Sequence, residues 1–335
     1  MREGARSELV SEERTGHAAG TGFENFWCSR PGAAGAGLLH DRYDPRRARS
    51  MAVVRPLERL RVAGAVVDIA VPAGCGCIPG VAMAGFRGRA DGPVRLPVVP
   101  YPAITMFIDL HGTLNIDDTG GRVPGSVVVS GLAPRSMGGH GGDVDLLQVR
   151  LSPVVAHAVL GASFELGETV ALLEDLWGRE AVRLHERLQA AGSWADRFAV
   201  MQTALARRLE AGRPVDPEVA FVWDQIVSRR GRVRVEPLAA AVGWSRKQLW
   251  SRFRHQLGVT PKRAATLVRF DHAARRLAAG HSAAVVAAES GFVDQSHLSR
   301  DVMAIAGITP KAVAVAPWLA VDPVAWPAQP WAARS

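Results

Sequence analysis

Lysine and arginine are the side chains of this sequence whose number and spacing most clearly indicate chemistry. The 335-residue chain has a formal net charge of +8, and between Ser228 and Lys311 there are 15 Lys or Arg residues against 5 acids. Cationic side chains at this density bind polyanions through charge-assisted hydrogen bonds. The block therefore predicts a surface for nucleic acid or for anionic membrane headgroups, and charge alone does not choose between them.

Side chains that bind metals or catalyse reactions are present but not grouped. Gly74–Cys77 holds two thiols one residue apart, whereas structural zinc needs four ligands, commonly in C-x-x-C pairs. The stretch "MGGHGG" at 137–142 lacks the Lys-Ser/Thr of a phosphate loop and predicts a flexible loop. The histidines that could converge as ligands, although ordinary surface or core roles are commoner, are His111, His140 and His157. We expect no catalytic residue, no metal and no cofactor.

The basic block contains one pattern twice. Leu238–Arg263 aligns with Val286–Ala312, and the copies end in "GVTPK" and "GITPK". Each copy predicts a short Ala-rich helix, a Gly-aromatic turn and a second helix that begins after Ser245 or Asp294, both favoured N-cap residues. Apolar residues at +4 and +8 from each N-cap predict a buried stripe, so that positions +1, +2, +5 and +6 point outward. This is the pattern of a helix-turn-helix. A single copy would fit any small helical hairpin, but two copies inside the basic block favour DNA binding.

The segment between the copies predicts one long helix. Leu267, Phe270, Ala274 and Leu277 fall on one face, and Gly280 is a stop signal. About 20 residues of helix span roughly 30 Å. Major grooves on one side of B-DNA recur about every 34–36 Å. One helix can therefore hold two DNA-reading units about a helical turn of DNA apart.

These residues resemble a known family. The first copy has "S-x-x-x-L-x-x-x-F" and "G-x-T-P", and the second has "GF-x-x-x-S-x-L-S-R" and "G-I-T-P". Over about residues 218–315 the chain resembles the AraC/XylS transcriptional regulators. The resemblance implies a seven-helix DNA-binding domain whose third and sixth helices enter adjacent major grooves. The middle of the chain is similar to the N-terminal domain in one branch of that family, which senses a ligand, dimerises, or does both.

The resemblance also implies roles for individual residues. Arg can donate two hydrogen bonds to guanine and Gln can pair with adenine, each worth about 1–3 kcal/mol of discrimination. Trp250 is equally compatible with the core, and for the flanking cations we expect attraction to phosphate without sequence content. The candidates for base contact are Arg246, Lys247, Trp250, Ser251, Gln295, Ser296, His297, Ser299 and Arg300, and the candidates for phosphate contact are Arg254, Lys262, Arg263 and Arg269.

The rest of the chain predicts an α+β fold. Residues 1–50 show no sustained period and predict a mobile leader, after which Met51 is a candidate for the natural initiator. Short β-prone runs predict a sandwich or barrel-like domain over 51–160, and the family resemblance implies that this domain senses a ligand or dimerises. Helical patterns predict a connector over 161–213, the all-α DNA-binding domain with two helix-turn-helix motifs covers 214–318, and the Pro- and Trp-rich 319–335 predicts an irregular tail.

The sequence thus predicts a sequence-specific DNA-binding transcriptional regulator that responds to a small-molecule effector, and not an enzyme. Double-stranded promoter DNA is the expected partner, with an effector, a second copy of the chain and RNA polymerase as further candidates. Three cysteines and the lack of a long apolar run favour a cytoplasmic protein without a membrane partner. The alternative is an enzyme of barrel type that converts a small molecule and carries a basic helical appendage.

Overall fold

The computed structural model describes residues 53–326, apart from short gaps at 56, 63–64, 74–77, 99, 113–114, 119–120, 124, 133–136, 162–166 and 168. All of these residues belong to one compact unit, Gly35–Ser335. The predicted leader and the thiols of Gly74–Cys77 lie outside the described residues.

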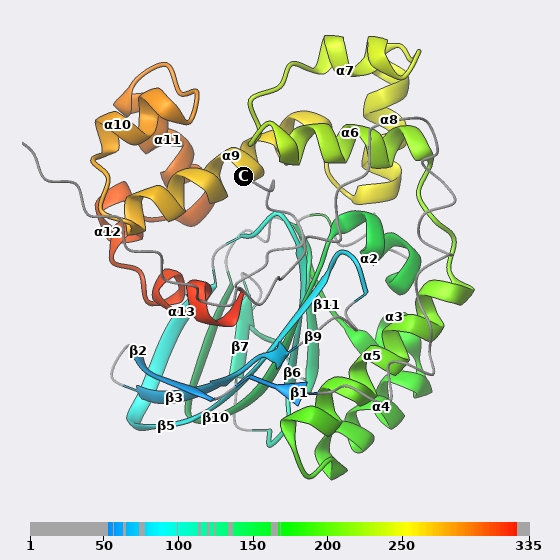
Figure 1. The fold of residues 1–335 in the computed structure, drawn as a ribbon, viewed down its shortest axis with the longest axis vertical. Helices are drawn as coiled ribbons and strands as arrows, with labels where there is room; N and C mark the ends of the chain where they lie inside the picture. The colour runs from blue at the N-terminus through cyan, green and yellow to red at the C-terminus, as the bar shows by residue number, and fades with distance from the viewer. Residues whose placement is uncertain are drawn as a thin grey trace, which may run out of the picture. The chain divides into compact units, whose positions relative to one another are not determined.

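The first half of the described chain forms an antiparallel sheet with the strand order β11-β9-β6-β10-β5-β3-β2 (Figure 1). The longest strands, β5 and β10, pair along most of their length, with a register shift between Gly141 and Asp143. Strands β7 and β8 extend the sheet beside β10, and β1 pairs with β4 separately. The strands are β1 Val53–Val54, β2 Glu58–Val62, β3 Ala65–Ala70, β4 Pro72–Ala73, β5 Val81–Val98, β6 Ile104–Asp109, β7 Asn115–Asp118, β8 Gly121–Val123, β9 Val127–Ser130, β10 Met137–Leu151 and β11 Val170–Leu172.

Both faces of the sheet are covered, because apolar residues occupy both sides of its central strands. Met83, Leu147 and Val149 contribute to the main core, whereas Ile69 and Phe86, on the opposite face, form a smaller cluster. Successive side chains of a strand point to opposite faces, so one strand can serve two cores. The main core is closed by the helices α2 Pro153–Leu160, α3 Leu173–Trp177, α4 Arg179–Ala190 and α5 Trp194–Ala211.

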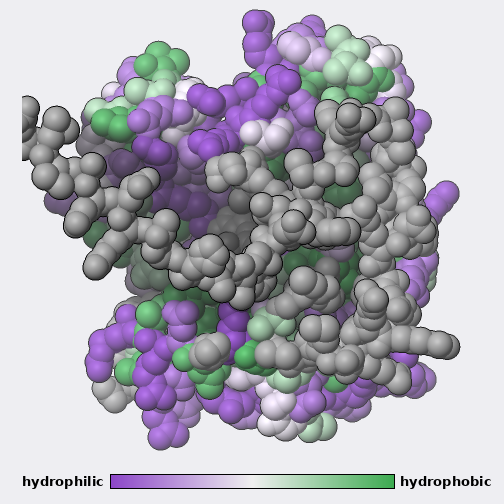
Figure 2. Space-filling view, in the orientation of Figure 1, coloured by the Kyte–Doolittle hydropathy of each residue, from purple (hydrophilic) through white to green (hydrophobic). Residues whose placement is uncertain are grey.

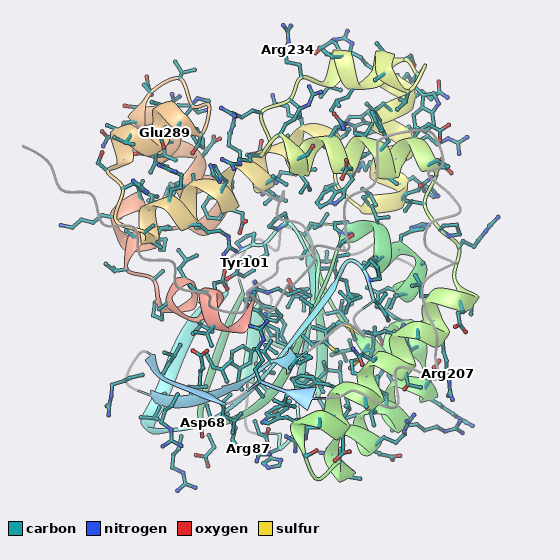
Figure 3. All side chains as sticks on the ribbon, in the orientation of Figure 1. Asp68, Arg87, Tyr101, Arg207, Arg234 and Glu289 are labelled. Atoms are coloured by element: carbon teal, nitrogen blue, oxygen red, sulfur yellow. The ribbon has the colours of Figure 1, made fainter. Side chains whose placement is uncertain are left out.

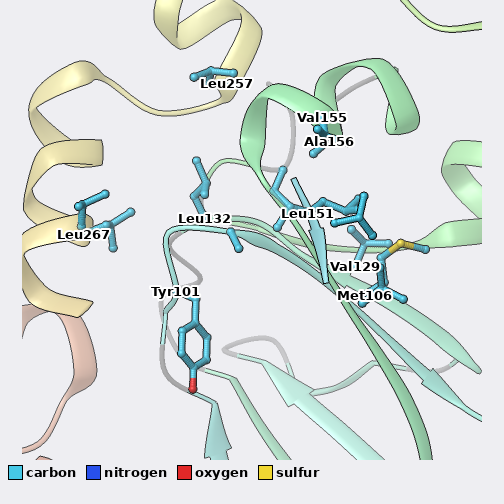
Figure 4. Close-up of a cluster of buried hydrophobic side chains, with 14 of the residues drawn as sticks. Tyr101, Met106, Val129, Leu132, Leu151, Val155, Ala156, Leu257 and Leu267 are labelled. Carbon is cyan, nitrogen blue, oxygen red and sulfur yellow. The ribbon is translucent and has the colours of Figure 1, made fainter. Parts of the chain in front are cut away.

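The remaining helices form the C-terminal region, and the main core continues into it without a break. Met106 and Leu151 of the sheet, Val155 of α2, and Leu257 and Leu267 of the C-terminal helices belong to the same buried cluster (Figure 4). The helices are α6 Pro217–Ser228, α7 Val235–Ala241, α8 Arg246–Leu257, α9 Pro261–Ala278, α10 Ala283–Glu289, α11 Gln295–Ala306, α12 Pro310–Ala314 and α13 Pro317–Ala325. An N-terminal antiparallel sheet followed by a helical C-terminal region confirms the predicted fold class.

Helix α13 packs on the second face of the sheet and brings a buried carboxylate with it. Asp322 lies 3.2 Å from Nη2 of Arg150 on β10 and 2.8 Å from Nη2 of Arg275 on α9. The Tyr101 hydroxyl also donates to Asp322, at 3.2 Å. The guanidinium of Arg150 lies between the rings of Tyr101 and Trp326, at 3.7 and 4.0 Å from their centroids. This cluster joins the sheet, α9 and α13 by charge as well as by apolar contact.

Three sequence expectations need correction. The "MGGHGG" segment was expected to be a loop, but Met137 to Gly141 pair with β5, and the first four of these residues also pair with β7. Hydrogen bonds from neighbouring strands thus override the weak strand propensity of glycine. The prediction of an irregular tail over 319–335 is wrong up to Ala325, because helix α13 covers Pro317–Ala325. Proline suits the first turn of this helix. Ala325 and Trp326 are buried in the smaller cluster. The connector also contributes a short strand, β11.

Candidate nucleic-acid interface

The first helix-turn-helix consists of α7 and α8. Gly243 has φ +69° in the turn between them, a left-handed conformation that favours glycine. Ser245 is the N-cap of α8, and its hydroxyl accepts a hydrogen bond from the amide of Gln248 at 3.1 Å. Leu249 and Phe253 are fully buried, so one face of α8 is fixed against the core. The opposite face is free to meet a ligand.

That free face carries the predicted contacts of the first unit. Arg246, Lys247 and Ser251 are exposed, and Trp250 is exposed over 45% of its surface, which excludes a core position for its indole. The guanidinium of Arg254 lies 5.2 Å from the centre of the Trp250 ring. A cation over an indole holds the ring in place while leaving its other side open.

The second helix-turn-helix repeats this arrangement in α10 and α11. Gly291 has φ +76°, and the carboxylate of Asp294 accepts from the amide of His297 at 2.7 Å as the N-cap of α11. Leu298 and Val302 are fully buried. The two predicted helix-turn-helix motifs are therefore confirmed, and both second helices keep a solvent-facing side.

The side chains of α11 differ in how freely they can meet a ligand. Gln295, Ser296 and Arg300 are exposed. His297 is half-buried and packs edge-on against Phe292 with a centroid distance of 5.4 Å, and the Ser299 hydroxyl donates to the carbonyl of Gln295 at 2.9 Å. The geometry therefore favours the first three residues as contacts over the last two.

The repeated Gly-aliphatic-Thr-Pro phrase is a pair of helix boundaries. Gly258 and Gly307 are left-handed C-caps of α8 and α11. Thr260 is the N-cap of α9 and Thr309 the N-cap of α12, and each hydroxyl accepts an amide hydrogen bond at 3.2 Å. A proline follows at the first helical position, where its missing N–H is not needed. The same phrase thus ends one helix and starts the next in both units.

Residues 238–314 match a family model described as a helix-turn-helix domain. This region is a helix-turn-helix domain of the AraC type. The chain is accordingly a DNA-binding transcriptional regulator. The matched residues run from within α7 to the end of α12. Counted from α6, which precedes the match, α8 and α11 are the third and sixth helices, the order that the family resemblance implies.

Comparison with other proteins adds likenesses of low similarity. No curated protein sequence matches the chain. The crystal structure of ToxT from Vibrio cholerae aligns with 71% of this chain and 98% of its own, with 10% identity and a TM-score of 0.41. ToxT bound to an unsaturated fatty acid aligns with 71% of this chain and 95% of its own, with 9% identity and a TM-score of 0.40. Streptomyces Pac13 with uridine aligns with 30% of this chain and 79% of its own, with 13% identity and a TM-score of 0.23. None of these likenesses assigns a ligand or an activity to this chain.

The cations that flank α8 and α11 occupy different environments. Lys262 is exposed near the start of α9, and Arg263 is half-buried. Arg269 forms an ion pair of 2.9 Å with Asp301 of α11 and lies 4.6 Å from the centre of the Phe292 ring. Its guanidinium therefore ties α9 to the second unit, whereas Lys262 is free to face solvent.

Sequence reasoning missed two residues at this surface. Glu236 of α7 accepts from Arg246 at 3.1 Å, and its own backbone amide together with Arg246 lowers the pKa of Glu236 below its ordinary value. Val293, just before the N-cap of α11, is 87% exposed. An apolar side chain at such a place can contact the methyl group of thymine. Both residues lie near the start of a helix, which is the signal that could have identified them. Glu236 was missed because it lies across the turn from α8, and Val293 was missed because an apolar residue there resembles a core position.

The sheet carries a separate charged cavity of about 440 Å³. Its deepest charge is Asp145, which is buried and lies 3.0 Å from Arg87, 3.0 Å from Arg197 and 3.3 Å from His111. The lining residues are Arg59, Val66, Asp68, Arg87, Gly88, Arg89, His111, Asp143, Val144 and Asp145. Cations and carboxylates alternate here, so the cavity suits a polar ligand that carries both kinds of group.

The described residues, which exclude Gly74–Cys77, hold no group of three or more His, Cys, Asp or Glu side chains placed to bind a metal ion. Over the same residues, no single helix is long and apolar enough to cross a membrane. Within the described part of the chain, one pair of helices, Gln295–Ala306 and Pro310–Ala325, reaches that length and composition together, but it is bent by 69°.

Proposed function

We propose that α8 and α11 read base edges in two successive major grooves, which makes the regulator sequence-specific. The observation that carries this proposal is the pair of capped helices with one buried and one exposed face, joined to the two ends of α9, α8 directly and α11 through α10. Helix α9 has 18 residues, so it is about 27 Å long. Adding the short turns at its ends brings the units to a separation comparable with one turn of B-DNA, roughly 34–36 Å.

The proposed base contacts are those of the two exposed faces. Arg246 and Lys247 lie in the first turn of α8, and Gln295 and Ser296 lie in the first turn of α11. The N-terminal residues of a reading helix are the ones that reach the base edges. Without DNA, Arg246 is paired with Glu236. On binding DNA, Arg246 would exchange this carboxylate for the edge of a guanine base. Trp250, Ser251 and Arg300 complete the proposed contacts, with His297 and Ser299 as weaker candidates.

The remaining cations are proposed to act on the DNA backbone. Arg254, Lys262 and Arg263 would supply attraction without sequence content, because phosphates are the same at every base pair. Arg269 would contribute mainly by holding α9 and α11 in register, since its guanidinium is already paired with Asp301.

A comparison of Arg246→Ala with Arg254→Ala tests these roles. Arg246→Ala is expected to cost about 1–3 kcal/mol for the operator and to relax specificity at one base pair. Arg254→Ala is expected to weaken all DNA sequences alike. The measurement is gel shift or fluorescence anisotropy on the upstream region of the protein's own gene and on operators changed one base pair at a time. An equal loss on every sequence from both variants would refute the assignment.

We further propose that the sheet region is a sensory domain, spanning about residues 51–160, whose effector is a small polar molecule. The charged cavity around Asp145 is the proposed binding site, because its buried carboxylate and surrounding cations can exchange partners with a ligand. Residues 161–213 would connect it to the DNA-binding domain at 214–318. A thermal-shift screen with a metabolite panel tests this. Effector-dependent stabilisation supports it, and catalytic turnover without DNA affinity would instead favour the enzyme alternative.

The cellular setting belongs to the same proposal. A regulator that binds promoter DNA would act in the cytoplasm, without enzymatic activity of its own. It would work as a homodimer or contact RNA polymerase while bound at the promoter. Sedimentation with and without operator DNA separates a monomer carrying two reading helices from a dimer.

A further inference from the structure

The segment between α6 and α7 is the most densely cationic part of the described chain. The six residues Arg229–Arg234 read "RRGRVR" and contain four arginines. All four are exposed. Hydrophilic residues gather over this part of the helical region at the top of the view in Figure 2, and Arg234 projects from the start of α7 in Figure 3. None of the roles proposed above uses these side chains.

This arginine segment, residues 229–234, has a fixed backbone. Arg230 has φ +55° and Gly231 φ +73°. Gly231 is buried, and a Cβ there would lie 2.2 Å from the carbonyl oxygen of Ala265 on α9, so only glycine permits this approach. The amides of Arg230 and Gly231 donate to Val227 and Ile226 at 2.9 and 2.8 Å. The segment is therefore a rigid turn seated on α9.

The arginine segment touches both helix-turn-helix units. Arg234 is the residue directly before α7. The guanidinium of Arg232 donates to the carbonyl of Glu289 at 3.4 Å, at the end of α10. The Arg232 side chain also lies against Gly291 in the second turn. The segment thus bridges the two units and lies between them.

Carboxylates offset the charge of the arginine segment only in part: Glu236 lies close enough to Arg234 for this cation to help lower the pKa of Glu236. Among the residues that the structure describes, Arg229, Arg230 and Arg234 form no ion pair with a carboxylate, and nearby Glu289 is already paired with Arg276. The cations also act on half-buried His272 of α9. Burial lowers the pKa of His272, and the positive charges of Arg230, Arg276 and Arg232 lower it further. Like charges held together in this way favour an anionic partner.

We infer that Arg229, Arg230, Arg232 and Arg234 form a phosphate clamp on the DNA backbone between the two major grooves occupied by α8 and α11. The inference rests on the proposed function, because it needs DNA to lie across both units. The stretch of duplex between two such grooves faces the protein with its minor groove, which is flanked by phosphates of both strands. DNA carries about one negative charge per 1.7 Å of axis, so a compact cluster of arginines can neutralise several charges there.

The test is the salt dependence of DNA binding by the full chain. In the triple variant Arg229→Gln, Arg230→Gln and Arg234→Gln, the plot of log K against log salt should become shallower by about 0.9 for each lost contact, or about 2.7 in all. Arg232 is kept because it also contacts the second unit. Affinity should fall by the same factor on operator and on random DNA, because phosphates carry no sequence. A urea unfolding midpoint equal to that of wild type shows that the variant is folded.

A matched control separates local contact from net charge. Arg183, Arg187 and Arg207 are exposed on α4 and α5, and changing them to Gln removes the same charge far from the proposed clamp. This control should keep the wild-type slope. Neutral methylphosphonates between the two half-sites should weaken wild type but not the arginine-segment variant further.

The outcomes are distinct. An unchanged slope in the arginine-segment variant, or equal slopes in the variant and its control, would overturn the phosphate clamp. Operator DNA that binds no better than random DNA to wild-type protein would instead count against the proposed function itself. A variant that keeps its DNA affinity but loses an acidic protein partner would show that the segment binds protein and not DNA.

Discussion

The substitution Asp322→Asn tests how strongly the buried charges hold α13 between the sheet and α9. The side chains of Asp322 and Arg150 are 2% and 3% exposed. The substitution keeps the shape of the side chain but removes its charge, so that the buried Arg150 loses its ion pair with Asp322. Arg275 is less affected because it also pairs with Asp271, at 3.0 Å.

The expected cost is large because the buried Arg150 guanidinium cannot exchange the lost Asp322 carboxylate for water. Removing one partner of a buried ion pair typically destabilises a protein by about 3–5 kcal/mol. Burial works against the charged form of Arg275, but Asp271 and Asp322 outweigh it and raise its pKa above the ordinary value. In the variant Arg275 keeps its pair with Asp271. We therefore expect a loss of about 3 kcal/mol, at the lower end of this range.

The assay is urea unfolding followed by circular dichroism, with two comparison proteins. Arg89→Gln removes a surface pair whose side chains are 84% and 56% exposed, and should cost no more than about 1 kcal/mol. The double variant Arg150→Met with Asp322→Leu replaces both charges by apolar groups and should recover most of the lost stability. A loss below about 1 kcal/mol for Asp322→Asn would refute the reasoning that this cluster stabilises the fold.

Two further predictions concern the helical region. Thr260→Ala removes the N-cap of α9 and should destabilise the protein by about 1 kcal/mol, with Thr266→Ala, whose hydroxyl bonds only within the helix, as the comparison. A cost no larger than that of the comparison would contradict the capping role. Burial and neighbouring arginines lower the pKa of His272 from its ordinary 6.5, so folding favours its neutral form. Its contribution to stability is complete above about pH 6.5 and is lost as the pH falls toward the lowered folded pKa. The urea midpoint of wild type should therefore drop between pH 7.5 and 5.5 by more than that of His272→Gln, and parallel curves would contradict this.

The helix-turn-helix units could be predicted from sequence because their signals are local. Gly243, Ser245 and Leu249 lie within a few residues of each other. Gly243 allows the left-handed turn, Ser245 caps the helix, and Leu249 packs in the core. The same holds for Thr260 followed by proline. Such short-range rules do not depend on where the rest of the chain lies.

Other parts could not be predicted because they depend on distant partners. Asp322 meets Arg150 across 172 positions, and nothing near Asp322 in the sequence announces a buried pair. The glycine-rich segment at 137–142 becomes a strand only because β5 and β7 supply hydrogen bonds on both sides. The exposure of Trp250 was open for a related reason: a tryptophan on a helix fits a core or a surface equally well until the neighbours are placed.

Gln256 anchors the C-terminal end of α8 to two other parts of the chain. Its carbonyl oxygen lies 3.0 Å from Nδ1 of His157 on α2, and its side-chain oxygen accepts from the amide of Asp216 at 2.7 Å. Arg246 stands ten positions earlier on the same helix, or about 15 Å from this anchor. A tilt of about 10° about the anchored end would move the first turn of α8 by about 2.6 Å, nearly the length of a hydrogen bond. If α8 contacts bases as proposed, a small adjustment of α2 would be magnified at its first turn into engagement or release of a base pair.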